Sequence, residues 1–309
     1  MSASPGPVQL GIGLALVLAG SLAYSTSFES LASRLGLGQG VAGVIVSPLL
    51  TSVPELAVFL AALLGFGSGG AMVAEGTVIG EPLVIATAAT PAVVALTGGL
   101  HVDRSLARPY IAFVALFPLV LLPGTLEGGR VTRALVAAAL LASYAALAAL
   151  SPTGEGMPEP RLSMSASATM LAASVAAFAL GSRLLVAGVL WASGVMGLDP
   201  LAVSSLLVPA VTALPESLAS LAWARRGVGT LAAASLVGEQ VLYATVYPAI
   251  AILVRPWPLT ALSAAGVVAT EAAMAVVALG VRRGRLGPGH ALFGLSCLVA
   301  YALLLGLAR

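Results

Sequence analysis

The stretch that decides the fold is LTSVPEL at residues 50–56, which interrupts an otherwise apolar run. It recurs once, as VTALPES at residues 211–217. Each copy places a hydroxyl, a proline and a carboxylate within five residues. A carboxylate in apolar surroundings needs a cation or a proton, because an unpaired charge is costly there. We therefore expect the two copies to face each other and to form one ion site.

The composition is that of a polytopic membrane protein. Of the 309 residues, 59% are hydrophobic and only 8% are charged, and the mean hydropathy is +1.06. Soluble domains carry about 25% charged residues, so a water-soluble fold would not hide this much apolar surface. The net charge of +2 is too small to indicate a nucleic-acid partner. Cys297 is the only cysteine, which excludes a disulfide framework and a thiolate metal site.

Ten apolar runs are predicted to cross the bilayer as helices, each of which needs roughly 20 apolar residues. They lie near 8–28, 38–65, 71–98, 108–123, 131–150, 165–196, 200–224, 229–254, 257–281 and 289–308. The fourth is short, and the sixth is either one long tilted helix or broken at Gly181 or Gly188. No basic segment precedes the first run, which favours a membrane helix over a cleaved signal peptide.

A polar linker divides the chain in the middle. Residues 151–162 begin SPTGEGMPEPR, which is too polar and too rich in proline to form a core. The first half, 1–150, and the second half, 163–309, then contain five helices each.

The arginines favour a multi-pass cell-membrane protein with both termini outside. With the N-terminus outside, the inner connections hold nine arginines and the outer ones four, and cytoplasmic loops carry the excess of basic residues. The nine are Arg34, Arg104, Arg108, Arg161, Arg225, Arg226, Arg282, Arg283 and Arg285.

The two halves are predicted to be inverted repeats. SPLLTSVPE at 47–55 matches VPAVTALPE at 208–216 at an offset of 161, and VIGE at 78–81 matches LVGE at 236–239 at an offset of 158. Because five helices precede it, the second half starts from the opposite side of the membrane, as in many secondary transporters. The prolines break the helices and release backbone carbonyls that a bound cation can satisfy.

Four carboxylates are expected at one depth, those of Glu55, Glu81, Glu216 and Glu239. Each lies nine or ten residues from a helix end, which at about 1.5 Å per residue is ~15 Å, the middle of a ~30 Å core. Either some of these groups are protonated, or a hard divalent cation lies among them within a shell of oxygens, which suits Ca²⁺. If Ca²⁺ leaves, Na⁺ or H⁺ must neutralise the carboxylates, so the two fluxes would be coupled.

The motifs TSVPEL at 51–56 and TALPES at 212–217 resemble the two α-repeat signatures of the cation/Ca²⁺ exchanger superfamily, of the prokaryotic Na⁺/Ca²⁺ exchanger type, whose signature is G-T-S-L-P-E. The resemblance extends to ten helices in two inverted halves, so we expect an all-α fold of that kind. It implies that Glu55 and Glu216 are the central Ca²⁺ ligands. It further implies that the ions bind to the hydroxyls of Thr51, Ser52 and Thr212. The backbone carbonyls of Pro48 and Pro209 are implied as further ligands.

The chain departs from the family pattern in the motif and in the third helix of each half. Leu50 and Val211 replace the motif glycine, and Ala213 replaces the second serine. Glu81 and Glu239 stand where the family has a Na⁺-binding serine, and we assign both to the metal site. These acids favour H⁺ coupling, or a different cation, over the usual Na⁺ stoichiometry.

The leading hypothesis is a secondary antiporter that exchanges Ca²⁺, or a similar divalent cation, for Na⁺ or H⁺ by alternating access. The alternatives are an exchanger for Mg²⁺ or Mn²⁺ with H⁺ coupling and a passive cation channel. An intramembrane enzyme is disfavoured, because the sequence has no H-E-x-x-H motif and no nucleophile elbow, and both aspartates lie in connections. We expect no cofactor besides the transported ions, no partner besides those ions and the bilayer, and a chain that is compatible with a monomer.

Some polar residues have an interpretation that involves no ion. The motif hydroxyls can bond back to the preceding helical turn. Glu75 is expected in the first turn of its helix, where the macrodipole favours an acid, and thus near the membrane interface. Arg183 and Glu271 are the remaining intramembrane charges, and they are a candidate ion pair.

Overall fold

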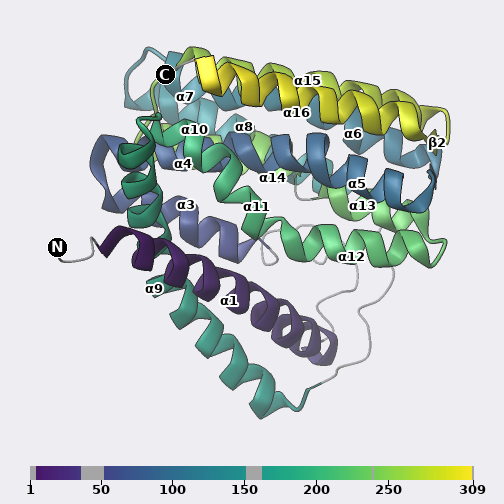
Figure 1. Ribbon diagram of the computed structural model, residues 1–309, viewed down its shortest axis with the longest axis horizontal. Coiled ribbons are helices and arrows are strands. Elements are labelled where there is room, and N and C mark those ends of the chain that lie inside the picture. Colours follow the sequence, from purple (N-terminus) through teal and green to yellow (C-terminus); the bar gives the residue numbers. More distant parts are fainter. Residues whose placement is uncertain (1–4, 36–51, 151–161, 239, 308–309) are drawn as a thin grey trace.

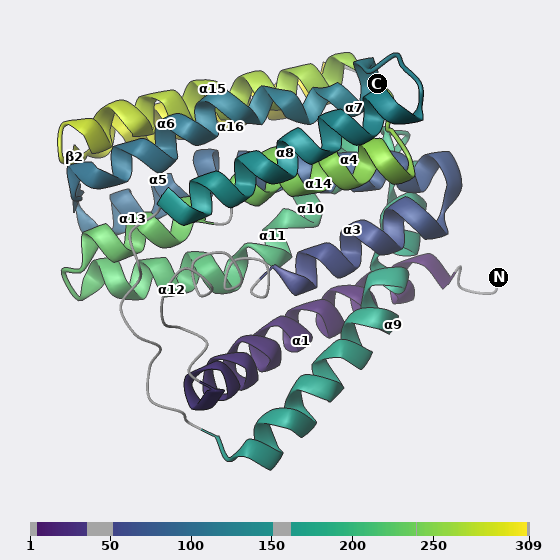
Figure 2. The ribbon, with the colours of Figure 1, turned by 180° about the vertical axis from the view of Figure 1, so that it is seen from behind.

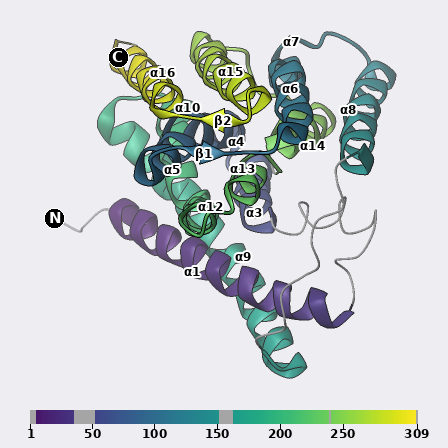
Figure 3. The same cartoon turned by 90° about the vertical axis from the view of Figure 1, so that its right-hand side faces the viewer.

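The computed structural model describes residues 5–35, 52–150, 162–238 and 240–307 (Figure 1). In these ranges every regular element is a helix, apart from one antiparallel pair of two-residue strands. These strands are Leu100–His101 (β1) and Arg285–Leu286 (β2). They tie the turn after α5 to the turn between α15 and α16, at the end of the molecule that faces the viewer in Figure 3.

The first half contains five consecutive apolar segments. The elements are α1 (Pro5–Leu35), α3 (Val53–Gly65), α4 (Gly67–Val84), the π-helix η1 (Ile85–Ala89), α5 (Thr90–Thr97), the 3₁₀-helix η2 (Arg104–Leu106), α6 (Ala107–Leu116), the 3₁₀-helix η3 (Phe117–Leu121), α7 (Leu122–Thr125) and α8 (Arg130–Leu150). The third segment therefore runs through α4, η1 and α5, and the fourth through η2, α6, η3 and α7.

The second half repeats this order. Its elements are α9 (Met164–Met196), α10 (Pro200–Leu207), α11 (Pro209–Thr212), α12 (Leu214–Arg225), α13 (Gly229–Gly238), α14 (Gln240–Val254), α15 (Ala261–Arg282) and α16 (Pro288–Leu307). Helices α10, α11 and α12 form the broken second segment of this half, and α13 and α14 form its third.

Eight helices of the described residues are long and apolar enough to cross a membrane, and a ninth span results if the bent α10–α12 segment is counted as one. Helix α3 is shorter, and residues 36–51, which precede it, lie outside the described part. The fourth segment spans Arg104–Thr125 and is longer than the sequence predicted. The chain is thus a multi-pass membrane protein of the predicted all-α class.

The first helices of the two halves lie antiparallel and in close contact. Along the lower edge of Figures 1 and 2, α1 crosses α9. A Cβ atom placed on Gly13 would lie 2.4 Å from the backbone nitrogen of Leu185, and one on Gly188 would lie 2.5 Å from the Cα of Leu10. Helix α9 is continuous, so its glycines serve close packing and do not break it.

Two contacts between the halves hold the centre of the molecule together. A Cβ atom on Gly80 of α4 would lie 2.2 Å from the carbonyl oxygen of Ser205 of α10, so these helices touch backbone to backbone. On another side, the ring of Phe59 of α3 packs edge-on against Tyr247 of α14, with centroids 4.9 Å apart. Both contacts lie within two turns of a predicted site residue, because Glu81 follows Gly80 and Glu55 precedes Phe59.

Candidate ion site

The motif builds the same local structure in both halves. Helix α3 begins at Val53 and helix α12 at Leu214, so each starts one residue before the proline of its motif. Proline is tolerated in the first helical turn, because its missing N–H would have no intrahelical partner there. In the second half the axis bends by 49° between α10–α11 and α12. The predicted helix break is therefore present at Ala213, just before Pro215.

Each motif glutamate consequently lies in the first turn of its helix, Glu55 in α3 and Glu216 in α12. The positive end of the helix macrodipole favours a negative charge at this position. The surroundings of the two carboxylates differ, because Glu55 is only 2% exposed whereas Glu216 is half-buried. The structure is thus asymmetric at positions that the repeat makes equivalent.

A hydrogen bond joins the third segment of the first half to the motif of the second half. The Thr212 hydroxyl lies 2.8 Å from Oε2 of Glu81 and 3.1 Å from the backbone carbonyl of Val208. Thr212 and Glu81 are both almost completely buried. The hydroxyl has one proton, so it serves the carboxylate and the preceding turn in alternation. Two residues predicted from different repeats therefore meet, and the bond to the preceding turn is also present.

Further polar atoms are buried in or directly beside the predicted motifs. Among the described residues, the Ser52 hydroxyl and Oε1 of Gln240 are buried without a hydrogen-bond partner. The π-helix η1 follows Glu81 and Pro82 closely, and such turns are frequent at functional sites. Sequence reasoning missed Gln240, although its place directly after Glu239 in an apolar run was a signal.

Three predicted ligands lie outside the described part of the chain, and a fourth has a backbone partner. Pro48, Thr51 and Glu239 lie outside the described residues. The carbonyl of Pro209 accepts a hydrogen bond from the Ala213 amide at 3.0 Å, so it closes the short helix α11. In the part of the chain that the structure describes, no three His, Cys, Asp or Glu side chains form a group that could hold a metal ion. The convergence of four carboxylates stays a prediction.

The position expected for Glu75 is wrong. It is the ninth residue of α4, beyond the first turn, and its side chain is 0% exposed. The helix begins earlier than its apolar run indicated, because the Gly67–Gly70 segment is already helical. The Ser263 hydroxyl of α15 donates a hydrogen bond to Oε1 of Glu75.

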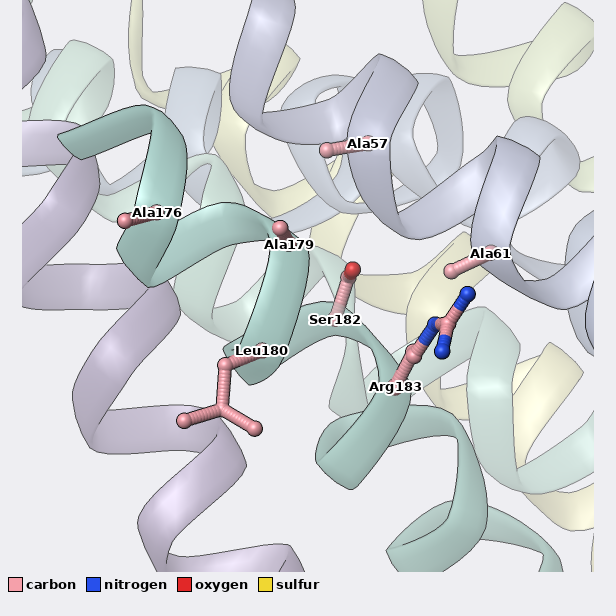
Figure 4. A pocket seen from close by; sticks show the side chains of 7 residues that line it. All are labelled: Ala57, Ala61, Ala176, Ala179, Leu180, Ser182 and Arg183. Carbon is pink, nitrogen blue, oxygen red and sulfur yellow. The ribbon is translucent and has the colours of Figure 1, made fainter. Parts of the chain in front are cut away.

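Arg183 lies in a shallow hollow between α3 and α9, beside Ala57 and Ala61 (Figure 4). Neither Arg183 nor Glu271 has an ion pair with a residue that the structure describes, and Oε1 of Glu271 has no hydrogen-bond partner there. The candidate pair between them is therefore not formed.

A family model matches just under half of the chain. Residues 6–151 match the model of the family described as sodium/calcium exchanger protein. No curated protein sequence matches the chain.

Among solved structures, the H⁺/Ca²⁺ exchanger CAX aligns with a TM-score of 0.75 and 16% identity, over 98% of this chain and 82% of its own. Native YfkE aligns with a TM-score of 0.75 and 17% identity over 99% and 92%. The sodium-calcium exchanger NCX_Mj, soaked with Na⁺ and Sr²⁺, aligns with a TM-score of 0.61 and 19% identity, over 96% of this chain and 97% of its own. These likenesses confirm the ten-helix inverted-repeat fold.

Proposed function

We propose that the chain, of which residues 6–151 match the sodium/calcium exchanger family model, is a secondary antiporter for Ca²⁺ or a similar hard divalent cation. Residues of both repeats would form the ion site, with Glu55 and Glu216 as central ligands. Glu81, Glu239, Thr51, Ser52, Thr212 and the carbonyls of Pro48 and Pro209 would complete it.

The observation that carries the proposal is the buried hydrogen bond between Thr212 and Glu81. It joins the second repeat to the first at the broken helix, where inverted-repeat transporters hold their ions. Ser52 and Gln240 offer further oxygen atoms without partners among the described residues. An all-oxygen donor set suits a hard cation such as Ca²⁺.

The counter-ion is proposed to be H⁺ or Na⁺. The acids at positions 81 and 239 replace neutral hydroxyls of the family pattern and support H⁺, because a carboxylate can neutralise itself by taking up a proton. The excess of arginines on one set of connections supports a topology with both termini outside. Figure 1 is compatible with this, because α1 begins and α16 ends at the same end of the molecule.

The test is transport by purified protein in proteoliposomes. Radioactive Ca²⁺ uptake is measured in exchange for internal Ca²⁺, for Na⁺ and for H⁺, and then with Mg²⁺ or Mn²⁺ as competitors. We expect Glu55→Gln and Glu216→Gln to abolish uptake in all three modes while the protein remains folded, because each removes a charged ligand. Glu271→Gln is the matched control, since Glu271 is an intramembrane glutamate outside the motif. Wild-type uptake by either motif variant would refute the assignment, and unitary currents in bilayer recordings would favour a channel.

A further inference from the structure

Glu75 is a buried acid that the ion site does not use. Its side chain is 0% exposed within α4, and its Oε2 atom has no hydrogen-bond partner among the described residues. It lies six residues before Glu81, which is about 9 Å along the helix axis. A carboxylate without a cation is costly at this position, so the group must hold a proton or lie close to a positive charge.

A chain of two hydroxyls leads from the surface of the protein to this carboxyl group. Thr260 is half-buried and precedes α15, and its hydroxyl lies 2.7 Å from that of Ser263. The Ser263 hydroxyl donates in turn to Oε1 of Glu75. The Thr260 amide also donates to the Ser263 oxygen at 3.3 Å, which leaves the proton of Ser263 free to point at Glu75. The chain thus has a direction, from Thr260 to Glu75.

The charges around Glu75 do not neutralise it. Asp199, the N-cap of α10, acts on Glu75 electrostatically. Glu75 in turn acts on the Tyr301 hydroxyl, which is hydrogen-bonded to the Ser205 hydroxyl at 2.9 Å. Among the described residues, Glu75 forms no ion pair and no hydrogen bond except that with Ser263. The other ionisable side chains on described helices packed against α4 are Glu55 on α3, Arg183 on α9, Tyr243 and Tyr247 on α14, and Glu271 and Arg282 on α15.

We propose that Glu75 is a proton carrier of the exchanger and that Thr260 and Ser263 are the relay through which its proton enters and leaves. A proton from water binds the Thr260 oxygen, the proton already on that oxygen moves to the Ser263 oxygen, and the Ser263 proton moves to Oε1 of Glu75. The hydroxyls then rotate back. In the reverse direction the same bonds form and break in the opposite order, and the proton returns to water.

The inference rests on the proposed function and gives it a coupling ion. A divalent cation beside Glu81 would stabilise the negative charge on Glu75 and favour release of its proton, because opposite charges attract strongly in a medium of low dielectric constant. Departure of the cation would reverse this. Each Ca²⁺ that binds would then release one proton through this relay.

The alternative is that Glu75 and Ser263 only lock α4 to α15. Glu75→Gln separates the two roles, because glutamine can still accept the hydrogen bond from Ser263 but cannot exchange a proton. Ser263→Ala and Thr260→Val remove the route and keep the carrier, whereas Thr260→Ser keeps both. Glu271→Gln is the control for the loss of another intramembrane acid.

The experiment combines an equilibrium and a rate measurement. The apparent affinity for Ca²⁺ is measured against pH in purified protein, and Ca²⁺ uptake driven by a pH gradient is measured in proteoliposomes. For Glu75→Gln we expect the slope of log affinity against pH to fall by about one, since one linked proton is lost, with exchange of Ca²⁺ for Ca²⁺ preserved. For Ser263→Ala and Thr260→Val we expect an unchanged slope and slower proton-driven uptake. Thr260→Ser and Glu271→Gln should match the wild type.

Other results would overturn the inference. An unchanged slope and unchanged proton-driven uptake in Glu75→Gln would mean that Glu75 only holds α4 against α15 through its hydrogen bond with Ser263. If exchange by the wild type responds to Na⁺ gradients but not to pH, Glu75 is not a proton carrier, although the proposed antiporter function is retained. A wild type without any Ca²⁺ exchange would refute the proposed function and this inference with it. If Glu75→Gln fails to fold, Ser263→Ala and Thr260→Val decide, since wild-type proton-driven rates in both would exclude the relay.

Discussion

The hydrogen bond from Thr212 to Glu81 is the contact whose removal tests the ion site most directly. In Thr212→Val the shape of the side chain is kept and the hydroxyl is lost. Oε2 of Glu81 then loses a donor at 2.8 Å, and the carbonyl of Val208 loses one at 3.1 Å. Because Glu81 is only 2% exposed, little water can replace the lost donor.

The size of the effect depends on the charge of Glu81. A hydrogen bond to a charged group contributes about 1.5–3 kcal/mol to stability, whereas polar contacts between membrane helices average about 0.6 kcal/mol. In protein without Ca²⁺ we therefore expect a coupling energy of about 1.5–3 kcal/mol between Thr212 and Glu81 at high pH, where the carboxylate is ionised. It should fall towards about 0.6 kcal/mol at low pH, where the group is neutral.

The assay is a double-mutant cycle. The free energy of unfolding of the wild type, Thr212→Val, Glu81→Gln and the double variant is measured by reversible unfolding in mixed detergent micelles at both pH values. Thr270→Val is the matched control, because Thr270 is also fully buried but its hydroxyl donates only within its own helix, to Gly266 at 2.8 Å. A coupling energy below about 0.5 kcal/mol at both pH values would mean that the contact does not support the site.

Two further variants test the packing and a loop. Gly13→Ala should lower the melting temperature, because its Cβ would lie 2.4 Å from the Leu185 backbone. Gly11→Ala is the control, and because it has open space around its Cβ its melting temperature should match or exceed that of the wild type. Equal melting temperatures for the two variants would contradict the close α1–α9 contact. The Ser105 backbone amide donates to Asp103 at 2.7 Å and holds the pKa of this carboxyl below its ordinary value. The stability that this bond adds is therefore present above the ordinary pKa and is lost as the pH falls through the lowered pKa. Asp103→Asn should remove this pH dependence, and an NMR titration that gives Asp103 its ordinary pKa would count against the prediction.

The sequence was sufficient for the features that a repeated motif imposes. Proline restricts the backbone at its own position, so the start of α3 at Val53 and of α12 at Leu214 follows from local chemistry. The apolar runs predicted the membrane segments, because a bilayer demands a minimum length of apolar chain. The odd number of helices in each half predicted the inversion that the solved exchangers share.

The sequence was insufficient where the outcome depends on a neighbour from elsewhere in the chain. Glu75 was expected near the interface because its position was counted from the start of an apolar run. Glycines at 67, 69 and 70 lengthen the helix without adding hydropathy, and Ser263, 188 residues further on, provides the partner. The unequal burial of Glu55 and Glu216 could not be predicted either, because equivalent positions in a repeat have the same sequence signal.

The acids within the predicted apolar runs support exchange over a purely structural role. Glu55, Glu75, Glu81, Glu216, Glu239 and Glu271 lie in predicted apolar runs that contain no basic residue. Arg183 lines the hollow between α3 and α9 and has no ion pair with a described residue, so it does not compensate Glu75 or Glu271. A carboxylate that stayed charged within the bilayer without compensation would cost ~2.5–3.5 kcal/mol or more. Oε2 of Glu75 has no hydrogen-bond partner among the described residues, so this group needs a proton or a nearby cation, which is the chemistry that an exchanger uses.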